Sequence, residues 1–209
     1  MVDNLVQITQ EVSVCQKCVL HHSRNNAVPG EGPEDSEIMF IGEGPGFYEN
    51  EQGRPFVGAA GKFLDELLAR AGLKRAEVWI GNVVKCRPPA NRDPLPEELE
   101  ACSEFLDRQI ASINPRIIVT LGRFSMEKFM PGARISAVHG QMRLVGNRHI
   151  VAMYHPAAAL HQGSLKPVLL EDFSRLTGLL EQARKFIPPS GSSLEPDKPG
   201  DEPKQLDLF

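Results

Sequence analysis

The stretch IMFIGEGPGFYENEQGRPFVGAAG, residues 38–61, decides the fold. Its first four residues are apolar and predict a buried strand, which ends in a glycine-rich run at residues 42–46. Glycine lets a backbone approach a ligand closely, and open α/β sheets bind ligands at the carboxyl ends of their strands. We therefore predict that this loop forms one wall of a ligand pocket.

Strands and helices alternate on both sides of this stretch. Short apolar runs predict further strands at residues 78–84, 116–121, 141–145 and 149–153. Apolar residues at helical spacing predict helices at residues 1–14, 59–71, 96–113 and 167–186. The alternation predicts an α/β protein with helices on both faces of one sheet.

The composition places limits on the class of protein. The 209 residues carry a net charge of -4, which argues mildly against a general polyanion binder. There is no apolar stretch of about 18 residues, so we expect no membrane span, and the N-terminus does not resemble a signal peptide. We expect a cytoplasmic monomer with one domain over residues 1–186.

Residues 187–209 differ from the rest of the chain. Up to residue 204 they are rich in proline, glycine, serine and charge. Such a segment cannot bury enough apolar surface to offset the entropy lost on ordering. We predict a disordered tail.

Four cysteines suggest a metal site. Cys15 and Cys18 form a C-x-x-C motif, and Cys86 and Cys102 follow later. In a chain without a signal peptide, cysteines favour metal binding or catalysis over disulfides. Four thiolates can hold a zinc ion or a [4Fe–4S] cluster, and their spacing does not choose between the two. A redox dithiol at the C-x-x-C motif, or four unconnected buried cysteines, are the alternatives.

Polar residues stand where predicted strands end. Glu43 lies between two glycines, where a carboxylate can orient a water or balance a developing cation. Asn82 interrupts an apolar strand, and its amide can both donate to and accept from a nucleobase. His155 follows the last strand, where it can stabilise a leaving anion. The alternatives are a solvated loop acid, a hydrogen-bonded core amide and a structural histidine.

Two other sets of residues are candidates for ligand contacts. Phe56 is either a stacking platform for a planar ligand or part of the core. Lys85, Arg87 and Arg92 crowd the loop after the second strand, where they can hold phosphates or simply face solvent.

Together these features resemble the family 4 uracil-DNA glycosylases, the iron–sulfur branch of their superfamily. The resemblance extends from Cys15 to about Arg184 and includes the four-cysteine pattern. It rests on the motifs GEGPG at residues 42–46, GRPFVG at 53–58, GNVVKCRPP at 81–89 with Asn91 and Arg92, and HPA at 155–157.

The resemblance implies a fold, a cofactor and a reaction. The fold would be a three-layer α/β/α sandwich around a central, mostly parallel four-stranded sheet. A [4Fe–4S] cluster would bind Cys15, Cys18, Cys86 and Cys102. The enzyme would flip uracil out of DNA and hydrolyse its N-glycosidic bond, which initiates base excision repair.

The resemblance also implies roles for single residues. Glu43 and His155 would be catalytic, the first by positioning water or stabilising the sugar cation, the second by donating a hydrogen bond to uracil O2. Phe56 would stack on uracil, Asn82 would read its edge, and Glu49 would exclude thymine. Gly42, Gly44 and Asn91 would complete the substrate site. Contacts to DNA would come from Lys85, Arg87, Arg92 and, as a wedge in the minor groove, Leu160.

Three departures from related sequences limit this transfer. Gly44 replaces an aspartate of the family 1 enzymes, so only Glu43 is left for the water-activating role. Asn50 stands where family 4 often has an acid. The chain also lacks the arginine- and histidine-bearing insertion of the relatives that trap uracil covalently, which favours simple hydrolysis.

The C-terminus indicates a protein partner. Its last five residues, QLDLF, resemble the pentapeptide by which bacterial repair proteins bind the sliding clamp, and the predicted contacts are Gln205, Leu206, Leu208 and Phe209. A flexible linker that ends in apolar anchors can dock in a groove without fixing the enzyme's orientation. The competing function is a non-catalytic iron–sulfur or zinc module that binds DNA and is tethered to the clamp.

Overall fold

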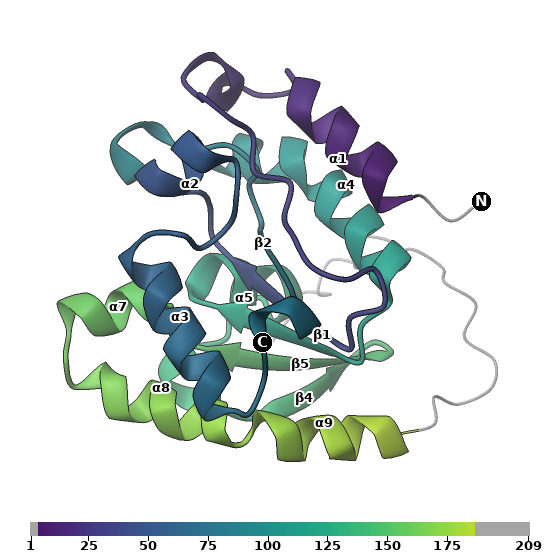
Figure 1. Cartoon of the computed structure of the whole chain (residues 1–209), viewed down its shortest axis with the longest axis vertical. Coiled ribbons are helices and arrows are strands. Elements are labelled where there is room, and N and C mark those ends of the chain that lie inside the picture. Colours follow the sequence, from purple (N-terminus) through teal and green to yellow (C-terminus); the bar gives the residue numbers. More distant parts are fainter. Residues whose placement is uncertain (1–3, 187–209) are drawn as a thin grey trace, which may run out of the picture.

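The structure, a computed structural model, describes residues 4–186 (Figure 1). The predicted tail lies outside the described residues. In chain order the elements are α1 (Leu5–Val14), η1 (Val19–His22), β1 (Ile38–Gly42), α2 (Phe47–Gln52), α3 (Ala59–Arg70), η2 (Arg75–Glu77), β2 (Trp79–Asn82), η3 (Pro89–Asn91), α4 (Pro96–Ile113), β3 (Ile117–Leu121), α5 (Arg123–Phe129), α6 (Ile135–Val138), β4 (Met142–Val145), β5 (Arg148–Met153), α7 (Pro156–His161), α8 (Leu165–Ser174) and α9 (Leu176–Lys185).

A single sheet with the strand order β2-β1-β3-β5-β4 forms the centre of the molecule. Strands β2, β1, β3 and β5 run parallel, and β4 pairs antiparallel with β5. The predicted α/β class and mostly parallel sheet are confirmed. The four strands that the resemblance implied are wrong, whereas the five apolar runs are confirmed, because the turn at Gly146, which has a φ of 58°, folds β4 back onto β5 as a fifth strand.

Helices cover both faces of the sheet (Figure 1). Along β1, Met39 and Ile41 pack into one core, while Ile38 and Phe40 pack into the other. Successive side chains of a strand point to opposite faces, so a strand buried on both faces reads as a continuous apolar run. The first core is completed by α1, α4 and α5, and the second by α3, α8 and α9. The predicted three-layer arrangement is confirmed.

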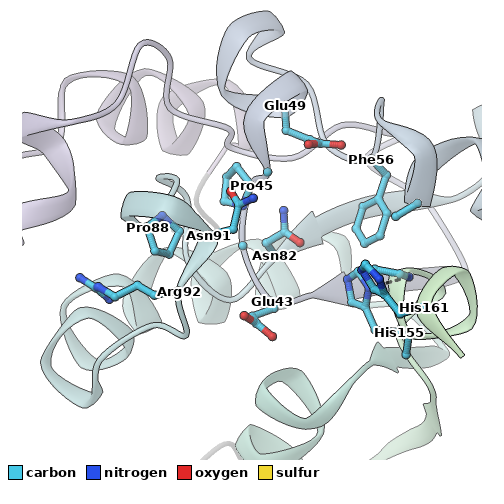
Figure 2. Close-up of a pocket in the computed structure, with 15 residues that line it drawn as sticks. Glu43, Pro45, Glu49, Phe56, Asn82, Pro88, Asn91, Arg92, His155 and His161 are labelled. Atoms are coloured by element: carbon cyan, nitrogen blue, oxygen red, sulfur yellow. Dashed lines mark hydrogen bonds between the residues drawn. The ribbon is translucent and has the colours of Figure 1, made fainter.

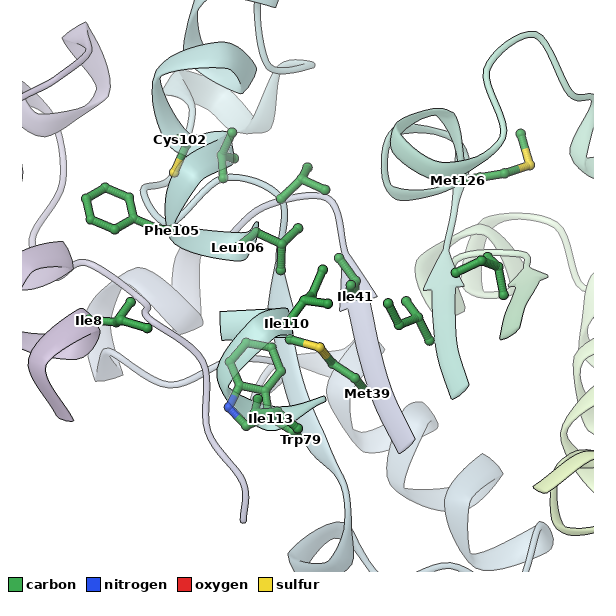
Figure 3. Packing of buried hydrophobic residues seen from close by; sticks show 14 of the residues in the cluster. Ile8, Met39, Ile41, Trp79, Cys102, Phe105, Leu106, Ile110, Ile113 and Met126 are labelled. Carbon is green, nitrogen blue, oxygen red and sulfur yellow. The ribbon is translucent and has the colours of Figure 1, made fainter. Parts of the chain in front are cut away.

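The first core holds the carboxyl half of β1 in place. Figure 3 shows Leu106 and Ile110 of α4 beside Met39 and Ile41 of the strand, with Trp79 of β2 close by. Each fully buried aliphatic side chain contributes about 1.5–3 kcal/mol to stability. This packing holds β1, and with it the start of the glycine loop, against α4.

Several segments differ from their predicted conformation. Two short helices, α2 and α7, begin after Gly46 and after His155, where the sequence predicts no helix. The single helix predicted over residues 167–186 is two helices, α8 and α9, which meet at Arg175. Helix α7 starts at a proline in its first turn, and the His155 side chain accepts a hydrogen bond from Ala157 N; these are local helix-start signals.

The parallel strands bring their carboxyl ends to one edge of the sheet. Gly42, the last residue of β1, is in register with Asn82, the last residue of β2. Strand β5 ends at Met153, two residues before His155. None of the helices within residues 4–186 is long and apolar enough to cross a membrane.

Two helical glycines should respond in opposite ways to alanine. A Cβ on Gly61 of α3 would lie 1.9 Å from the Phe56 carbonyl oxygen, whereas one on Gly178 of α9 would meet nothing within 4 Å. We expect Gly61→Ala to lower the free energy of unfolding by about 1–3 kcal/mol through overpacking. Gly178→Ala should raise it by about 0.5–1 kcal/mol, because alanine favours the helix. Urea unfolding of both variants measures this, and equal stabilisation would contradict the close packing of α3 on the Phe56 loop.

Candidate active site

A pocket of about 360 Å³ lies at the carboxyl edge of the sheet (Figure 2). This volume suits a small planar ligand. Its walls come from the loops after β1 and β2, from the Phe56 loop with the start of α3, and from α7. The lining residues are Glu43, Gly44, Pro45, Gly46, Glu49, Phe56, Ala60, Asn82, Pro88, Asn91, Arg92, His155, Ala157, Ala158 and His161.

Phe56 is held in a left-handed backbone conformation with a φ of 51°. A residue with a side chain adopts this conformation at a cost, so the surroundings must fix it. Arg75 donates hydrogen bonds to the carbonyl oxygens of Pro55 and Phe56, at 2.5 and 3.2 Å. The ring then stacks on the imidazole of His155, with centroids 5.6 Å apart and planes 24° apart.

Glu49 ties the Phe56 loop to α2. Its Oε1 accepts hydrogen bonds from the backbone N–H groups of Val57 and Gly58, both at 2.9 Å. Gly58 is the residue before α3, where a carboxylate is favoured by the exposed N–H groups and the helix dipole. The structure thus gives Glu49 a structural contact besides its place in the pocket wall.

Asn82 is buried at the base of the pocket, with 1% of its surface exposed. Its Oδ1 has no hydrogen-bond partner among the described residues. A buried amide oxygen without a partner is costly. Since the side chain points into the pocket in Figure 2, a ligand can supply the missing donor.

His155 is prepared as a neutral hydrogen-bond donor. Its Nδ1 accepts from the Ala157 N–H at 3.1 Å, which places the ring proton on Nε2. Burial lowers the pKa of His155 to about 4, although the Glu49 carboxylate acts in the opposite direction. At neutral pH the ring is therefore uncharged and can donate from Nε2.

Glu43 is a half-buried carboxylate on the opposite side of the pocket from Glu49 (Figure 2). Burial raises its pKa, Asp93 raises it further, and Arg123 opposes both. No hydrogen bond to another described residue occupies the carboxylate. It is available to a water or to a cationic ligand.

Of the three basic residues predicted to contact DNA, Lys85 is buried, whereas Arg87 and Arg92 are not. The Lys85 side chain is buried, and its Nζ donates to Asn82 O at 2.9 Å and to Gln109 Oε1 at 2.7 Å. It is turned away from solvent, so the prediction that Lys85 contacts DNA phosphates is wrong. Arg92 of the same loop lines the pocket and pairs with buried Glu98, and Arg87 donates to Oδ1 of Asn91, another lining residue.

The glycines of the loop make room for these side chains. A Cβ on Gly42 would lie 2.5 Å from Asn82 Oδ1 and 2.7 Å from Phe56 Cζ, and one on Gly44 would lie 2.8 Å from Val84 Cγ2. Asn50, whose role was open, is structural: its Oδ1 accepts from Asn25 N at 2.9 Å.

Helix α7 adds residues that the sequence did not single out. Ala157, Ala158 and His161 line the pocket from this helix, at helical spacing. The proline after His155 was the available signal, since proline is common in the first turn of a helix. Leu160, the predicted wedge, is 51% exposed on the same helix.

All four cysteines line one small cavity beside α1 and α4. Backbone or side-chain N–H groups donate to three of the sulfurs: Lys17 N to Cys15 at 3.5 Å, Arg24 Nη1 to Cys86 at 3.2 Å and Lys85 N to Cys102 at 3.3 Å. Burial raises the pKa of Cys102 to about 11 and also raises that of Cys86 and Cys18.

Four thiolates can hold either a single tetrahedral ion or an iron–sulfur cluster. Within residues 4–186, no three histidine, cysteine or acidic side chains are grouped as a single metal ion requires. A cubane cluster holds its cysteines farther apart than a tetrahedral ion does. Hydrogen bonds to sulfur are a common feature of iron–sulfur sites, so the N–H donors to Cys15, Cys86 and Cys102 are compatible with a cluster.

Comparison with known proteins identifies the class. The family model described as "Uracil DNA glycosylase superfamily" matches residues 29–174, which include the pocket. The chain belongs to this superfamily.

The relatives identify the branch. The type-4 uracil-DNA glycosylase of Saccharolobus solfataricus is 50% identical over 83% of this chain and 85% of its own length. The type-4 enzyme of Sulfurisphaera tokodaii is 46% identical over 88% of both chains, and that of Thermotoga maritima is 44% identical over 90% of this chain and 98% of its own. Within the superfamily, the family is that of the type-4 uracil-DNA glycosylases, as the motifs predicted.

Proposed function

We propose that the protein removes uracil from DNA by hydrolysing the bond between uracil N1 and the deoxyribose C1′. One observation carries this proposal. A single base-sized pocket is lined both by a neutral His155 and by Asn82, whose Oδ1 has no hydrogen-bond partner. The type-4 relatives, named for this activity, support it. We propose the cytoplasm as the place of action, and base excision repair as the process that the reaction initiates.

Recognition of uracil would use three walls of the pocket. The flipped base would stack on Phe56, and Asn82 would pair its amide with the N3–H and O4 of uracil. Glu49 would occupy the space beside C5 and exclude the methyl group of thymine. Gly42, Gly44 and Asn91 would shape the remainder, because the two glycines leave the space that the base needs.

Catalysis would stabilise charge on both sides of the breaking bond. As the C1′–N1 bond breaks, its electron pair leaves with uracil and negative charge develops on O2, to which His155 Nε2 donates a hydrogen bond. The sugar becomes cationic, and Glu43 would stabilise it and position the water that attacks C1′. The attacking water loses one proton to Glu43 or to solvent as its oxygen bonds to C1′, the uracil anion takes up a proton from the same source, and the products are uracil and an abasic site.

DNA would be held around the mouth of the pocket. Arg87 and Arg92 can reach phosphates from the loop after β2. Leu160 would enter the minor groove and keep the duplex open after the base has flipped.

Glu43 provides the test of this function. With a uracil-containing oligonucleotide, the wild-type protein should yield abasic sites, and Glu43→Gln should slow the single-turnover rate by about 10²- to 10⁴-fold. Glu66→Gln, at an exposed position of α3, is the matched control and should keep the wild-type rate. A Glu43→Gln protein with full activity would remove Glu43 from the mechanism. A wild-type protein that binds DNA without cleaving would favour the non-catalytic module.

The pH profile separates the two catalytic residues. Because the pKa of Glu43 is raised above 4.5 and that of His155 is lowered to about 4, Glu43 gains its proton first as the pH falls. The wild-type rate should fall on the acid side above pH 4.5, and the residual rate of Glu43→Gln should be flat there. An inflection near 6.5 that Glu43→Gln retains would indicate an ordinary histidine and contradict the neutral donor.

We also propose that Cys15, Cys18, Cys86 and Cys102 hold a [4Fe–4S] cluster. The cluster would join the segment after α1 to the loop after β2 and to α4, which is a structural role because none of its ligands lines the active-site pocket.

The cluster proposal is tested by composition. The purified protein should contain about four iron and four sulfide per chain and be brown. Cys102→Ser should lose iron and unfold at lower urea, while Ser103→Ala, at the next position of α4, should keep both. Zinc in place of iron, or a stable metal-free protein, would contradict it.

For the tail we propose docking on the sliding clamp through Gln205, Leu206, Leu208 and Phe209. The support is the sequence alone, because these residues lie outside the described part of the chain. Replacing Leu208 and Phe209 with serine should abolish clamp binding in a direct binding assay and leave the rate on short oligonucleotides unchanged. Undiminished affinity of that variant would sink the proposal.

A further inference from the structure

Two aromatic side chains are exposed at the start of α2. Phe47 is 51% exposed and Tyr48 is 58% exposed, and their rings meet edge to face with centroids 5.4 Å apart. Within residues 4–186, the other large apolar side chains with comparable exposure are all valine or leucine. Aromatic rings bury a large apolar area, so an exposed pair suggests that something covers it.

The pair stands on the rim of the active-site pocket. Pro45 and Gly46, immediately before it, and Glu49, immediately after it, line that pocket. The Tyr48 ring lies against the start of α3, since a Cβ on Gly58 would be 3.4 Å from its Cδ2. Helix α2 is held rigidly there by the Glu49 contacts to the Phe56 loop.

Arg87 completes this surface on its other side. Its guanidinium carbon lies 5.3 Å from the centroid of the Phe47 ring, and its Nε donates to Asn91 of the pocket wall. No carboxylate of the described residues forms a salt bridge with it, in contrast to Arg92, which pairs with Glu98. We call Phe47, Tyr48 and Arg87 the aromatic shelf.

We propose that the aromatic shelf stacks an unpaired nucleobase next to the flipped uracil, with Arg87 on the adjoining phosphate. This inference rests on the proposed function of the pocket. Base stacking on aromatic side chains tolerates any sequence and combines with cationic contacts to the backbone in proteins that bind single strands. In a duplex the flanking base stays paired with its complement and stacked on its next neighbour, so it is not free to turn onto the shelf, which therefore favours DNA whose flanking base is unpaired.

The shelf and Leu160 therefore serve different substrates. Leu160 lies on α7, on another wall of the pocket, and a wedge acts only where a stacked duplex must be opened. A single strand needs no wedge but requires a surface that orders its flexible neighbours. Loss of the shelf should then affect single strands more than duplexes.

The test compares the same uracil-containing strand alone and annealed to its complement opposite guanine. Phe47→Ser/Tyr48→Ser should raise KM for the single strand about tenfold or more, the loss of roughly one stacked base. KM for the duplex should change by less than about twofold. Leu144→Ser, at a 50% exposed position of β4, is the control and should change neither. Phe47→Trp/Tyr48→Trp should retain the single-strand KM.

A second measurement detects the stacking directly. A single strand with 2′-fluorinated deoxyuridine, which resists cleavage, and 2-aminopurine beside it should lose fluorescence on binding to the wild type but not to the serine variant. The shelf would be overturned if the serine variant raised KM equally for both substrates or for neither. Unchanged quenching of 2-aminopurine by the serine variant would also overturn it. Absence of cleavage by the wild type would refute the proposed function instead, because the binding signal does not depend on cleavage.

Discussion

The pocket at the carboxyl edge of the sheet depends on the absence of a side chain at Gly42. At this position β1 ends in register with Asn82, and any Cβ would overlap both the Asn82 amide and the Phe56 ring. The parallel pairing of β1 with β2 brings the two strand ends together, and the missing side chain turns their meeting point into a cavity. Glycine is therefore required at this position by the packing of Asn82 and Phe56, whatever chemistry the pocket performs. The buried ladder behind it, fixed by two apolar cores, sets where Glu43, Asn82 and Phe56 lie.

Much of this arrangement was predictable from the sequence, because it depends on local signals. Apolar runs at residues 38–41, 78–84 and 149–153 identify strands, although the second run continues past Asn82, where β2 ends, and parallel strands necessarily share a carboxyl edge. The polar residues at those ends were therefore expected in one pocket, and the pocket does bring Glu43, Asn82 and His155 together.

What could not be predicted depends on contacts between distant segments. In the sequence, Lys85 lies in a basic loop, between an apolar run and Cys86. In the structure, the backbone bond from Val84 N to Glu43 O holds the preceding residue against the loop after β1, at the edge of the sheet. There Lys85 meets Gln109, which itself is fixed by Pro29 O. Helix α2 could not be predicted from hydrophobic periodicity either, because its six residues are too few to show a helical repeat. It is stabilised by tertiary contacts such as that of Asn50 with Asn25.

Helix α7 and its cap carry two of the proposed functional residues, His155 and Leu160. Its cap is His155, through the bond from Ala157 N, and its last turn presents Leu160 and His161. Because a single turn and a half of helix behaves as one rigid piece, the position of the ring at its start and of the leucine near its end cannot be adjusted independently. An insertion or deletion within α7 would shift its last turn relative to the ring. The length of this helix therefore sets the distance between the His155 ring and Leu160.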